Sequence, residues 1–225
     1  MGDGRRPEDL LATQRRYYDL RAPDYADESR PSDRRAEGLL DPALVRDLVD
    51  GMAPAGDVLE LACGPGAFTR ELVRHAATLT CLDGSPRMLA RNRAEVGDPR
   101  VRYLCADLFA WAPRRTYDAV FFGFWLSHVP PSHFDRFWDL VAACLAPGGR
   151  ALFVDEDERA AGLEVSRTDD GVPTARRRLS DGRAFDIVKV FWRAGDLEAR
   201  LAGAGWDARV RPLGATCYAG SATRR

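Results

Sequence analysis

The sequence contains almost no lysine and few histidines. Of its 33 basic residues only Lys189 is a lysine, and the others are arginine. Because arginine is so abundant, its presence at a given position says little about function. The three histidines lie at no metal-ligand spacing from the five cysteines, and there is no C-x-x-C pair. We therefore expect no metal site, and five reduced thiols in a cytoplasmic protein.

Long apolar runs and a charge bias are also missing. No apolar stretch approaches the roughly 20 residues that a membrane-spanning helix needs. The first ten residues are polar and lack the apolar core of a signal peptide. A formal net charge of −1 argues against nucleic acid or an anionic membrane as partner. We expect a cytoplasmic monomer or homodimer that acts on a small molecule.

What the sequence does contain is ordinary globular composition and a repeated strand–helix alternation. Hydrophobic residues make up 45% and charged residues 30% of 225 residues, enough for one domain with a buried core. The pattern predicts strands at 57–62, 78–82, 101–104, 117–124 and 151–154, with helices at 67–76, 86–95 and 131–145. Such alternation indicates an α/β fold with a mostly parallel, doubly wound sheet.

Further elements flank this core. Helices are expected at 8–20 and 41–50, the second beginning after Asp41, and they form an N-terminal cap. Residues 158–175 are polar and are expected to form a loop or mobile cover. A β-hairpin is predicted over 176–190, turning at Asp181-Gly182. A helix at 195–203 and two antiparallel strands at 208–210 and 216–219 complete a single domain.

A small-residue loop follows the first core strand and opens a helix. Its sequence is Glu60-Leu-Ala-Cys-Gly-Pro-Gly66. Small side chains at Ala62, Gly64 and Gly66 let a ligand approach the backbone, and the N–H groups of the helix N-terminus face that ligand. A dinucleotide-binding motif would place a third glycine where Thr69 stands, so a pyrophosphate ligand is disfavoured.

Asp83 ends the next strand and completes the pattern. An acid at this position can accept hydrogen bonds from both ribose hydroxyls of a nucleoside. The glycines alone are compatible with an ordinary tight turn. Together with Asp83 they favour a nucleoside-containing ligand.

These segments resemble the class I S-adenosylmethionine (SAM)-dependent methyltransferases. The loop at 60–66 is similar to their first motif, and Leu82-Asp-Gly-Ser-Pro-Arg-Met88 to their ribose-binding segment. Cys105-Ala-Asp-Leu-Phe109 resembles their adenine-binding segment, and Leu145-Ala-Pro-Gly-Gly149 their link into the fifth strand. The resemblance implies SAM as cofactor and a Rossmann-like fold, with a mostly parallel seven-stranded sheet, a helical cap and a β-hairpin insertion.

The resemblance also implies where SAM is held. Gly64 and Gly66 would lie against its methionyl part, and Glu60 would position the loop and the amino group. The ribose would be held at Asp83, followed by Gly84.

Two further parts of the cofactor site follow from the same resemblance. The adenine would contact Asp107 and Leu108, although Asp107 also fits a turn cap. Met88 would pack on the adenosine or in the core. Tyr17 and Tyr25 would close the pocket or simply pack the cap helix.

A narrower resemblance extends past the SAM motifs. It connects the chain with the phosphonate O-methyltransferase of dehydrophos biosynthesis and its relatives, and implies a phosphonate substrate in antibiotic or other specialised metabolism. It rests on Asp107-Leu-Phe-Ala-Trp111, Asp118-Ala-Val-Phe-Phe122, Trp125-Leu-Ser-His-Val-Pro130, Arg177-Arg-Leu-Ser-Asp-Gly-Arg183 and Ile187-Val-Lys-Val-Phe191.

Three residues are candidates for the substrate side. His128 follows the central strand at its carboxyl end, where α/β sheets place their ligands. It could donate to an oxyanion, act as a base, or be satisfied by backbone bonds. Arg177 and Lys189 on the hairpin could clamp an anionic group, or belong to a solvated basic strand. His75 and His133 are expected to be structural or exposed.

The sequence therefore predicts a SAM-dependent O-methyltransferase for a small anionic substrate, preferably a phosphonate. An anionic oxygen needs a counter-charge rather than a base. One alternative is a methyltransferase for a carboxylate, hydroxyl or amine with His128 as base. Two others are a nicotinamide-dependent oxidoreductase and a SAM-binding protein without catalysis.

Overall fold

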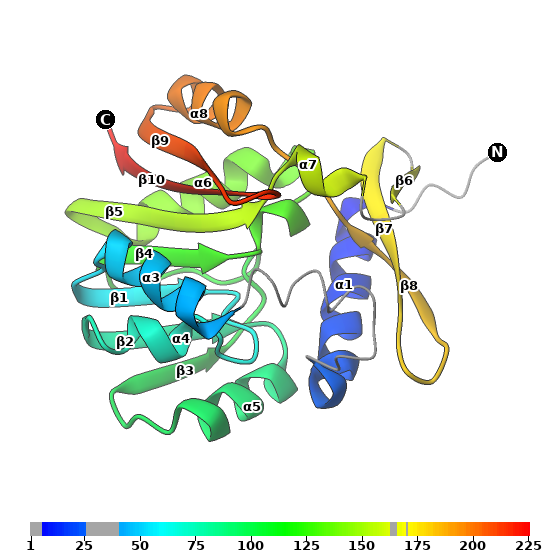
Figure 1. The fold of residues 1–225 in the computed structure, drawn as a ribbon, viewed down its shortest axis with the longest axis horizontal. Coiled ribbons are helices and arrows are strands. Elements are labelled where there is room, and N and C mark those ends of the chain that lie inside the picture. The colour runs from blue at the N-terminus through cyan, green and yellow to red at the C-terminus, as the bar shows by residue number, and fades with distance from the viewer. Residues whose placement is uncertain (1–5, 26–40, 163–165, 170) are drawn as a thin grey trace.

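A seven-stranded sheet forms the centre of the computed structural model, which describes residues 6–25, 41–162, 166–169 and 171–225 (Figure 1). The strand order is β3-β2-β1-β4-β5-β10-β9. The strands are β1 (Gly56–Leu61), β2 (Ala76–Asp83), β3 (Val101–Cys105), β4 (Tyr117–Gly123), β5 (Leu145–Glu156), β9 (Trp206–Leu213) and β10 (Cys217–Arg224). The strand order reverses at β1: β2 and β3 follow on one side of it, and β4 and β5 lie on the other. Such a reversal creates a crevice at the carboxyl ends of the strands, where α/β sheets bind ligands.

The pairing confirms a mostly parallel sheet. Strand β1 runs parallel to β2 and β4, and β4 runs parallel to β5. Only β10 reverses, pairing antiparallel with both β5 and β9. The apolar sequences of β1 and β4 fit this arrangement, since a central parallel strand is buried on both faces.

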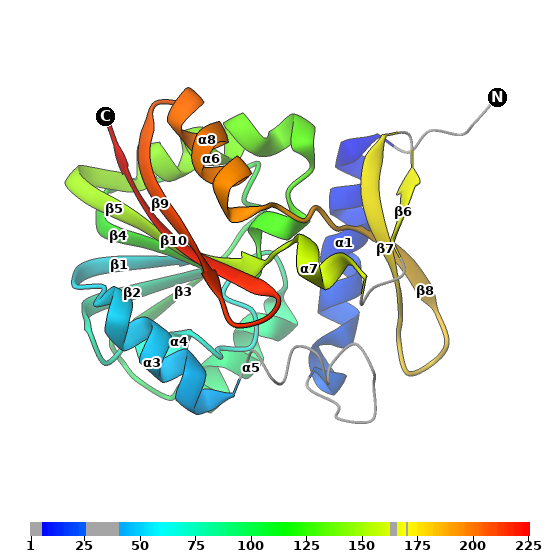
Figure 2. The ribbon, with the colours of Figure 1, turned by 45° about the horizontal axis from the view of Figure 1, so that its top comes forward.

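Helices cover both faces of the sheet (Figures 1 and 2). Helices α3 (Pro42–Met52), α4 (Thr69–Leu72) and α5 (Pro86–Val96) pack on one face, and α6 (Phe134–Cys144) and α8 (Ala194–Gly203) on the other. Successive residues of β4 point to opposite faces of the sheet. Ala119 and Phe121 pack in the core on one face, and Val120 and Phe122 pack in the core on the other. Among the described residues, no helix is long and apolar enough to cross a membrane.

The cap combines helix α1 with a second, smaller sheet. This sheet has the order β6 (Ser166–Asp169), β7 (Val172–Arg178), β8 (Ala184–Val188), all antiparallel. Helix α1 (Pro7–Arg21) packs against it, with Leu10 beside Val188. Figure 2 shows α1 and the small sheet together beyond the carboxyl ends of the parallel strands. Short helical turns connect these parts: η1 (Ala22–Asp24), η2 (Leu126–His128), η3 (Pro131–His133) and α7 (Glu158–Ala161).

Several boundaries differ from the sequence-based expectation. The described residues of the segment 158–175 are largely not loop, because they form α7, β6 and the start of β7. This polar segment forms strands because β6 and β7 pair antiparallel, which satisfies their backbone groups. The helix expected at 67–76 is limited to α4, since Ala76 already pairs with Gly56 as β2 begins. Strand β5 starts at Leu145, with an irregular register opposite β4.

Other local signals are confirmed. Ser85 caps α5 by accepting a hydrogen bond of 3.1 Å from the Met88 N–H, and Asp41 caps α3 through the Ala43 N–H at 2.8 Å. The hairpin turns where expected, with Gly182 at φ +87°, a conformation that favours glycine.

Candidate active site

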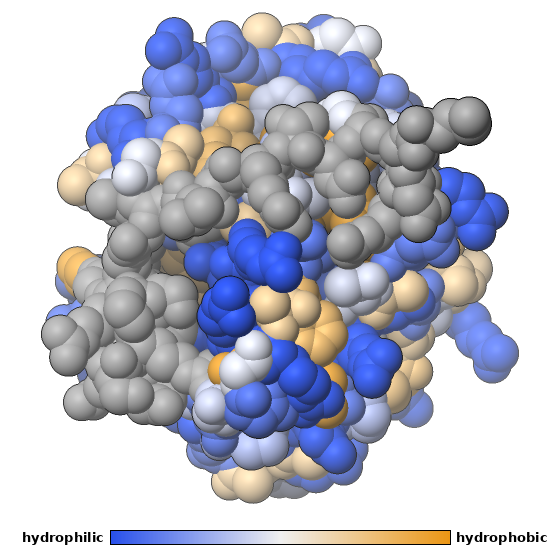
Figure 3. All heavy atoms as spheres, turned by 90° about the vertical axis from the view of Figure 1, so that its right-hand side faces the viewer, coloured by the Kyte–Doolittle hydropathy of each residue, from blue (hydrophilic) through white to orange (hydrophobic). Residues whose placement is uncertain are grey.

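A cavity of about 560 Å³ lies at the carboxyl ends of the parallel strands. Its walls come from the glycine loop, the ends of β2, β4 and β5, the segment after β3, helix α1 and the small sheet. From outside, hydrophilic side chains surround a smaller apolar area at this end of the molecule (Figure 3). The cavity therefore lies between the core and the cap, at the place where α/β sheets bind ligands.

The glycine loop gives the cavity its floor. Ala62, Gly64 and Gly66 have φ angles of +51°, +52° and +104°. A side chain at Gly64 would meet no atom within 4 Å, so its backbone is open to a ligand. A side chain at Gly66 would come within 2.9 Å of Asn92, and Gly66 does not line the cavity. Gly66 therefore lets the loop pack closely on Asn92, and its contact with the cofactor stays a prediction.

A buried polar chain supports this loop from below. The Thr69 hydroxyl donates to Glu60 at 2.6 Å, and the Asn92 amide donates to Thr69 Oγ1 at 2.8 Å and to the Gly64 carbonyl at 3.2 Å. Burial raises the pKa of Glu60 to about 8, against the opposing effect of its hydrogen bonds. Glu60 thus lies under the loop and is not among the residues that line the cavity, a position that suits its expected role in holding the loop, and its role toward the cofactor amino group stays a prediction.

Asp83 lies beside the loop, at the end of β2. Its carboxylate accepts from the Gly64 N–H at 2.9 Å and from the Ser85 N–H at 2.8 Å. Burial raises its pKa, and these backbone donors oppose the rise. Gly84 follows, where a side chain would meet Arg15 Cδ at 3.0 Å. Met88 lines the same wall although it is buried, so both of its expected roles are compatible with its position.

Helix α1 reaches across to the segment after β3. Arg15 forms an ion pair with Asp107, which also accepts from the Phe109 N–H at 3.1 Å. Leu108 is buried and lines the cavity. Asp107 is therefore both a turn cap and a cavity residue, and its partner Arg15 was not among the sequence-based candidates.

The tyrosines of the cap differ in their positions. Tyr25 lines the cavity, with the Arg21 guanidinium 4.7 Å from its ring centre. Tyr17 is buried against Leu179 and Ile187 and is not among the residues that line the cavity, a position that suits packing of the cap helix, the second of its two expected roles. Tyr18 lines the cavity instead. Successive helical residues point about 100° apart, so Tyr17 and Tyr18 face different surroundings.

His128 is held by two hydrogen bonds. Its Nδ1 lies 2.8 Å from the Val188 carbonyl, which only accepts, so Nδ1 carries the proton. Burial and the nearby Lys189 hold the pKa of His128 well below its usual range. In the neutral ring Nε2 is an acceptor, and the Tyr18 hydroxyl donates to it at 2.9 Å. The lone pair that a general base would need is already engaged.

Positive charge gathers around this histidine. Arg21, Arg177 and Lys189 all line the cavity, and all three lower the His128 pKa electrostatically. Lys189 is buried, pairs with Glu156 and donates to the Ser127 hydroxyl at 3.1 Å. It is therefore part of a buried network rather than a solvated strand.

Strand alternation separates the neighbouring arginines of β7. Arg177 lines the cavity, whereas Arg178 is exposed and does not. Beneath the cluster, burial raises the pKa of Asp155 to about 6, and Lys189 opposes the rise.

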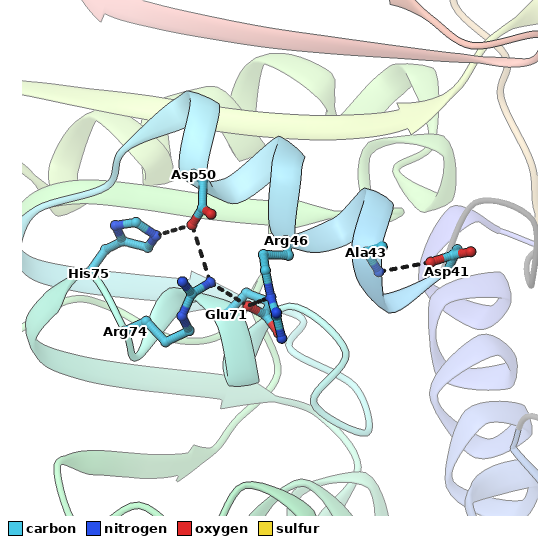
Figure 4. Close-up of polar contacts among 7 residues, drawn as sticks. All are labelled: Asp41, Ala43, Arg46, Asp50, Glu71, Arg74 and His75. Atoms are coloured by element: carbon cyan, nitrogen blue, oxygen red, sulfur yellow. Dashed lines mark hydrogen bonds and ion pairs between the residues drawn. The ribbon is translucent and has the colours of Figure 1, made fainter.

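The other histidines lie outside the cavity. His75 Nε2 donates a hydrogen bond of 2.6 Å to the Asp50 carboxylate, and Arg74 pairs with both Asp50 and Glu71 in a surface ion-pair network that ties α3 to α4 (Figure 4). His133 packs edge-on against Phe109. Within the described part of the chain, no cluster of His, Cys, Asp or Glu could hold a metal ion.

Comparisons with known proteins agree with this geometry. Residues 58–149 match the family described as "Methyltransferase domain". Two solved structures of DhpI, one with SAH and one with SAM and HEP, are 36% and 35% identical to the chain. They cover 96% and 95% of it, and it covers 97% of each, with a TM-score of 0.80 for both. The chain belongs to the class I SAM-dependent methyltransferases. The oxidoreductase alternative is therefore set aside.

The curated relatives of this methyltransferase match it over a shorter stretch. The trans-aconitate 2-methyltransferase of Streptomyces avermitilis is 36% identical over 135 residues, which are 55% of this chain and 47% of the relative. That of Escherichia fergusonii is 36% identical over 95 residues, or 36% of its length. The chain thus matches about half or less of these relatives.

The cavity fits the cofactor of this methyltransferase, which is SAM. The open backbone at Gly64 and the Asp83 carboxylate lie side by side on its floor, joined by a hydrogen bond of 2.9 Å. Met88 and Leu108 add apolar surface next to them. A nucleoside with an amino-acid tail needs this combination of close backbone, carboxylate and apolar wall.

Proposed function

We propose that this methyltransferase transfers the methyl group of SAM to an oxygen of a small anionic substrate, preferably a phosphonate. The main support is that Arg21, Arg177 and Lys189 line the cavity together with His128 and lie close enough to lower its pKa. A site with this charge suits an oxyanion. We further assign Asp83 to the ribose, Gly64 to the methionyl part, and Asp107 with Leu108 to the adenine.

The chemistry asks little of the protein beyond alignment and charge. When bound, SAM would supply an electrophilic methyl group on its sulfonium sulfur: an O–CH3 bond would form as the S–CH3 bond breaks, and SAH would leave. An oxygen that is already anionic needs no base for this transfer. Arg177 can hold two oxygens of an oxyacid through its planar fork, whereas Lys189 acts as a point charge. The walls of the cavity, which come from the core and from the cap, can fix the direction of approach.

This geometry argues against His128 as a general base. Its Nδ1 proton is committed to Val188 and its Nε2 lone pair to Tyr18. Nearby cations further oppose protonation of the ring. A hydroxyl or amine substrate would need a base with a free lone pair.

A carboxylate is the second candidate substrate. The trans-aconitate 2-methyltransferases share 36% identity with part of the chain, and their name supports esterification of a carboxylate. The same cations would hold it. The narrower sequence resemblance, and the DhpI structures that span nearly the whole chain, favour the phosphonate.

A mass-spectrometric methylation assay tests the proposal. Purified enzyme and SAM are given alkyl- and aminoalkylphosphonates, carboxylates of the same carbon skeletons, and a few phenols. We expect monomethyl esters of the phosphonates. Products formed only from carboxylates would select the second candidate, and products formed only from phenols would contradict the anionic substrate altogether.

A further inference from the structure

The backbone turns sharply at Phe124, the residue that follows β4. Its φ angle is +54°, in the left-handed region that a bulky side chain rarely adopts. The Phe124 N–H donates to the Val154 carbonyl at 2.8 Å, so the turn is tied to β5. Phe124 also lines the cavity. A strained backbone at a ligand site indicates that the side chain is held there for a function.

The turn changes the face of the sheet on which the Phe124 side chain lies. Val120 and Phe122 pack in the core that contains α6, so regular alternation along the strand would send Phe124 to the same side. Phe124 packs instead on the opposite core, and Trp125 takes the α6 side, next to Phe137. The left-handed turn therefore aims the Phe124 ring away from α6.

Phe68 holds this ring beside the glycine loop. The ring centres of Phe68 and Phe124 are 5.9 Å apart, and Phe68 packs on Phe121 at 5.0 Å. Gly123 leaves room for this packing, because any side chain there would collide with the Phe68 ring. Phe68 comes shortly after the glycine loop and lines the cavity. The two rings thus form an aromatic wall between the loop and the end of β4.

This wall lies where the cofactor and substrate parts of the cavity meet. Glu60 pairs with Phe121 in the register of β1 and β4, so the glycine loop and Phe124 emerge at the same edge of the sheet. The proposed function assigns the methionyl part of SAM to Gly64 and the oxyanion to the surroundings of His128, which follows Phe124 in η2. The reacting methyl group has to lie between these two places, on a sulfonium that carries a positive charge.

The cavity must therefore accept a cation and an anion close together. Arg21, Arg177 and Lys189 suit the oxyanion but repel a sulfonium. A carboxylate beside the sulfonium would attract it and would also repel the anionic substrate. The face of an aromatic ring attracts a cation through its quadrupole and has no net charge that repels an oxyanion.

We propose that the Phe124 ring faces the sulfonium of SAM and makes the enzyme bind SAM more tightly than it would without this ring. SAH is a neutral thioether and gains nothing from the quadrupole, so the contact favours the cofactor over the product. Trp125 is less suited to this role, because it packs against Phe109 and Phe137. The inference rests on the proposed assignment of Gly64 and deepens it.

Binding of SAM and SAH to Phe124→Leu tests this role. Leucine keeps an apolar contact and removes the aromatic face. Calorimetry should show that the preference for SAM, measured as the Kd of SAH divided by the Kd of SAM, falls on the order of fivefold below that of the unaltered enzyme. The fall should come mainly from weaker binding of SAM. Phe124→Tyr retains an aromatic face and should keep the ratio.

Phe109→Leu is the matched control, because Phe109 also lines the cavity but belongs to the segment assigned to the adenine. It should leave the ratio unaltered, whatever it does to the affinity for both ligands. If Phe124→Leu does not fold, Phe124→Gly replaces it, since glycine adopts a positive φ without strain. The glycine variant should lower the ratio as well.

The outcomes separate this inference from the proposed function, because the binding measurements need no substrate. An unaltered ratio in Phe124→Leu would overturn the inference: an equal loss of SAM and SAH affinity would mean that the ring only packs, and a higher substrate KM alone would mean that it contacts the substrate. A lowered ratio in an enzyme that methylates only phenols would keep the sulfonium contact and refute the anionic substrate. An unaltered ratio in an enzyme that methylates phosphonates would do the reverse.

Discussion

Asp83 is the residue on which cofactor binding should depend most. Its carboxylate accepts from two backbone N–H groups and lines the cavity. Asp83→Asn should weaken SAM binding on the order of tenfold to a hundredfold, because hydrogen bonds to a charged group are the strong ones. Asp207→Asn, on the exposed edge strand β9, is the control. Calorimetry measures both, and an unaltered Kd in Asp83→Asn would refute the ribose assignment.

The buried Glu60 predicts a pH effect on stability. Burial raises its pKa from 4.5 to about 8, so the folded protein retains a proton that the unfolded chain releases. The stability linked to this proton is present below pH 4.5 and is lost as the pH rises through about 8. Glu60→Gln cannot titrate. Urea unfolding should therefore show the unaltered protein losing stability relative to Glu60→Gln across this range, and a constant difference would contradict the prediction.

At the scale of elements, those with strong local signals could be predicted from the sequence. Ser85 and Pro86 marked the start of α5, and Gly182 marked the hairpin turn. The switch from β1 to a small-residue loop followed by Asp83 located the cofactor end of the sheet. These signals depend on backbone conformation and on residues close in sequence.

Other features depend on contacts between distant segments and could not be predicted in this way. Strand β6 exists because it pairs with β7, and its polar residues carry no strand pattern of their own. On α1, Tyr17 and Tyr18 are the same residue type at neighbouring positions. Which of them lines the cavity depends on how the helix is rotated against the small sheet, and this rotation cannot be read from local sequence. The polar neighbours Gln14 and Arg15 share the cavity side with Tyr18, and their helical spacing was the available signal.

Strand β7 gives a prediction with a built-in control. Its residues alternate, so Arg177 lines the cavity while Arg178 is exposed. Arg177→Ala should raise the KM for an anionic substrate by on the order of tenfold or more and leave SAM affinity unaltered. Arg178→Ala should change neither quantity. Steady-state kinetics measures the KM of both variants. An equal change of KM in the two variants would mean that Arg177 belongs to a solvated basic strand and does not bind the substrate.

On the scale of the whole molecule, cap and core are joined by a few polar contacts around the cavity. Arg15 pairs with Asp107, the Ser85 hydroxyl donates to Asp19 at 2.7 Å, and Arg91 donates to the Ala22 carbonyl at 3.1 Å. Each contact connects the cap with a segment that belongs to the cofactor end. A ligand in the cavity contacts both sides and must therefore strengthen their association.

Binding of SAH should consequently protect the cap as well as the glycine loop. At a hundredfold excess over its Kd, a ligand stabilises the folded state by about 2.7 kcal/mol. Hydrogen–deuterium exchange should slow in α1 and β8, although neither carries a cofactor motif. Strand β9, on the far edge of the sheet, should change only if the whole fold is stabilised. Protection confined to the loop at 60–66 would show that the cap is not coupled to the cofactor.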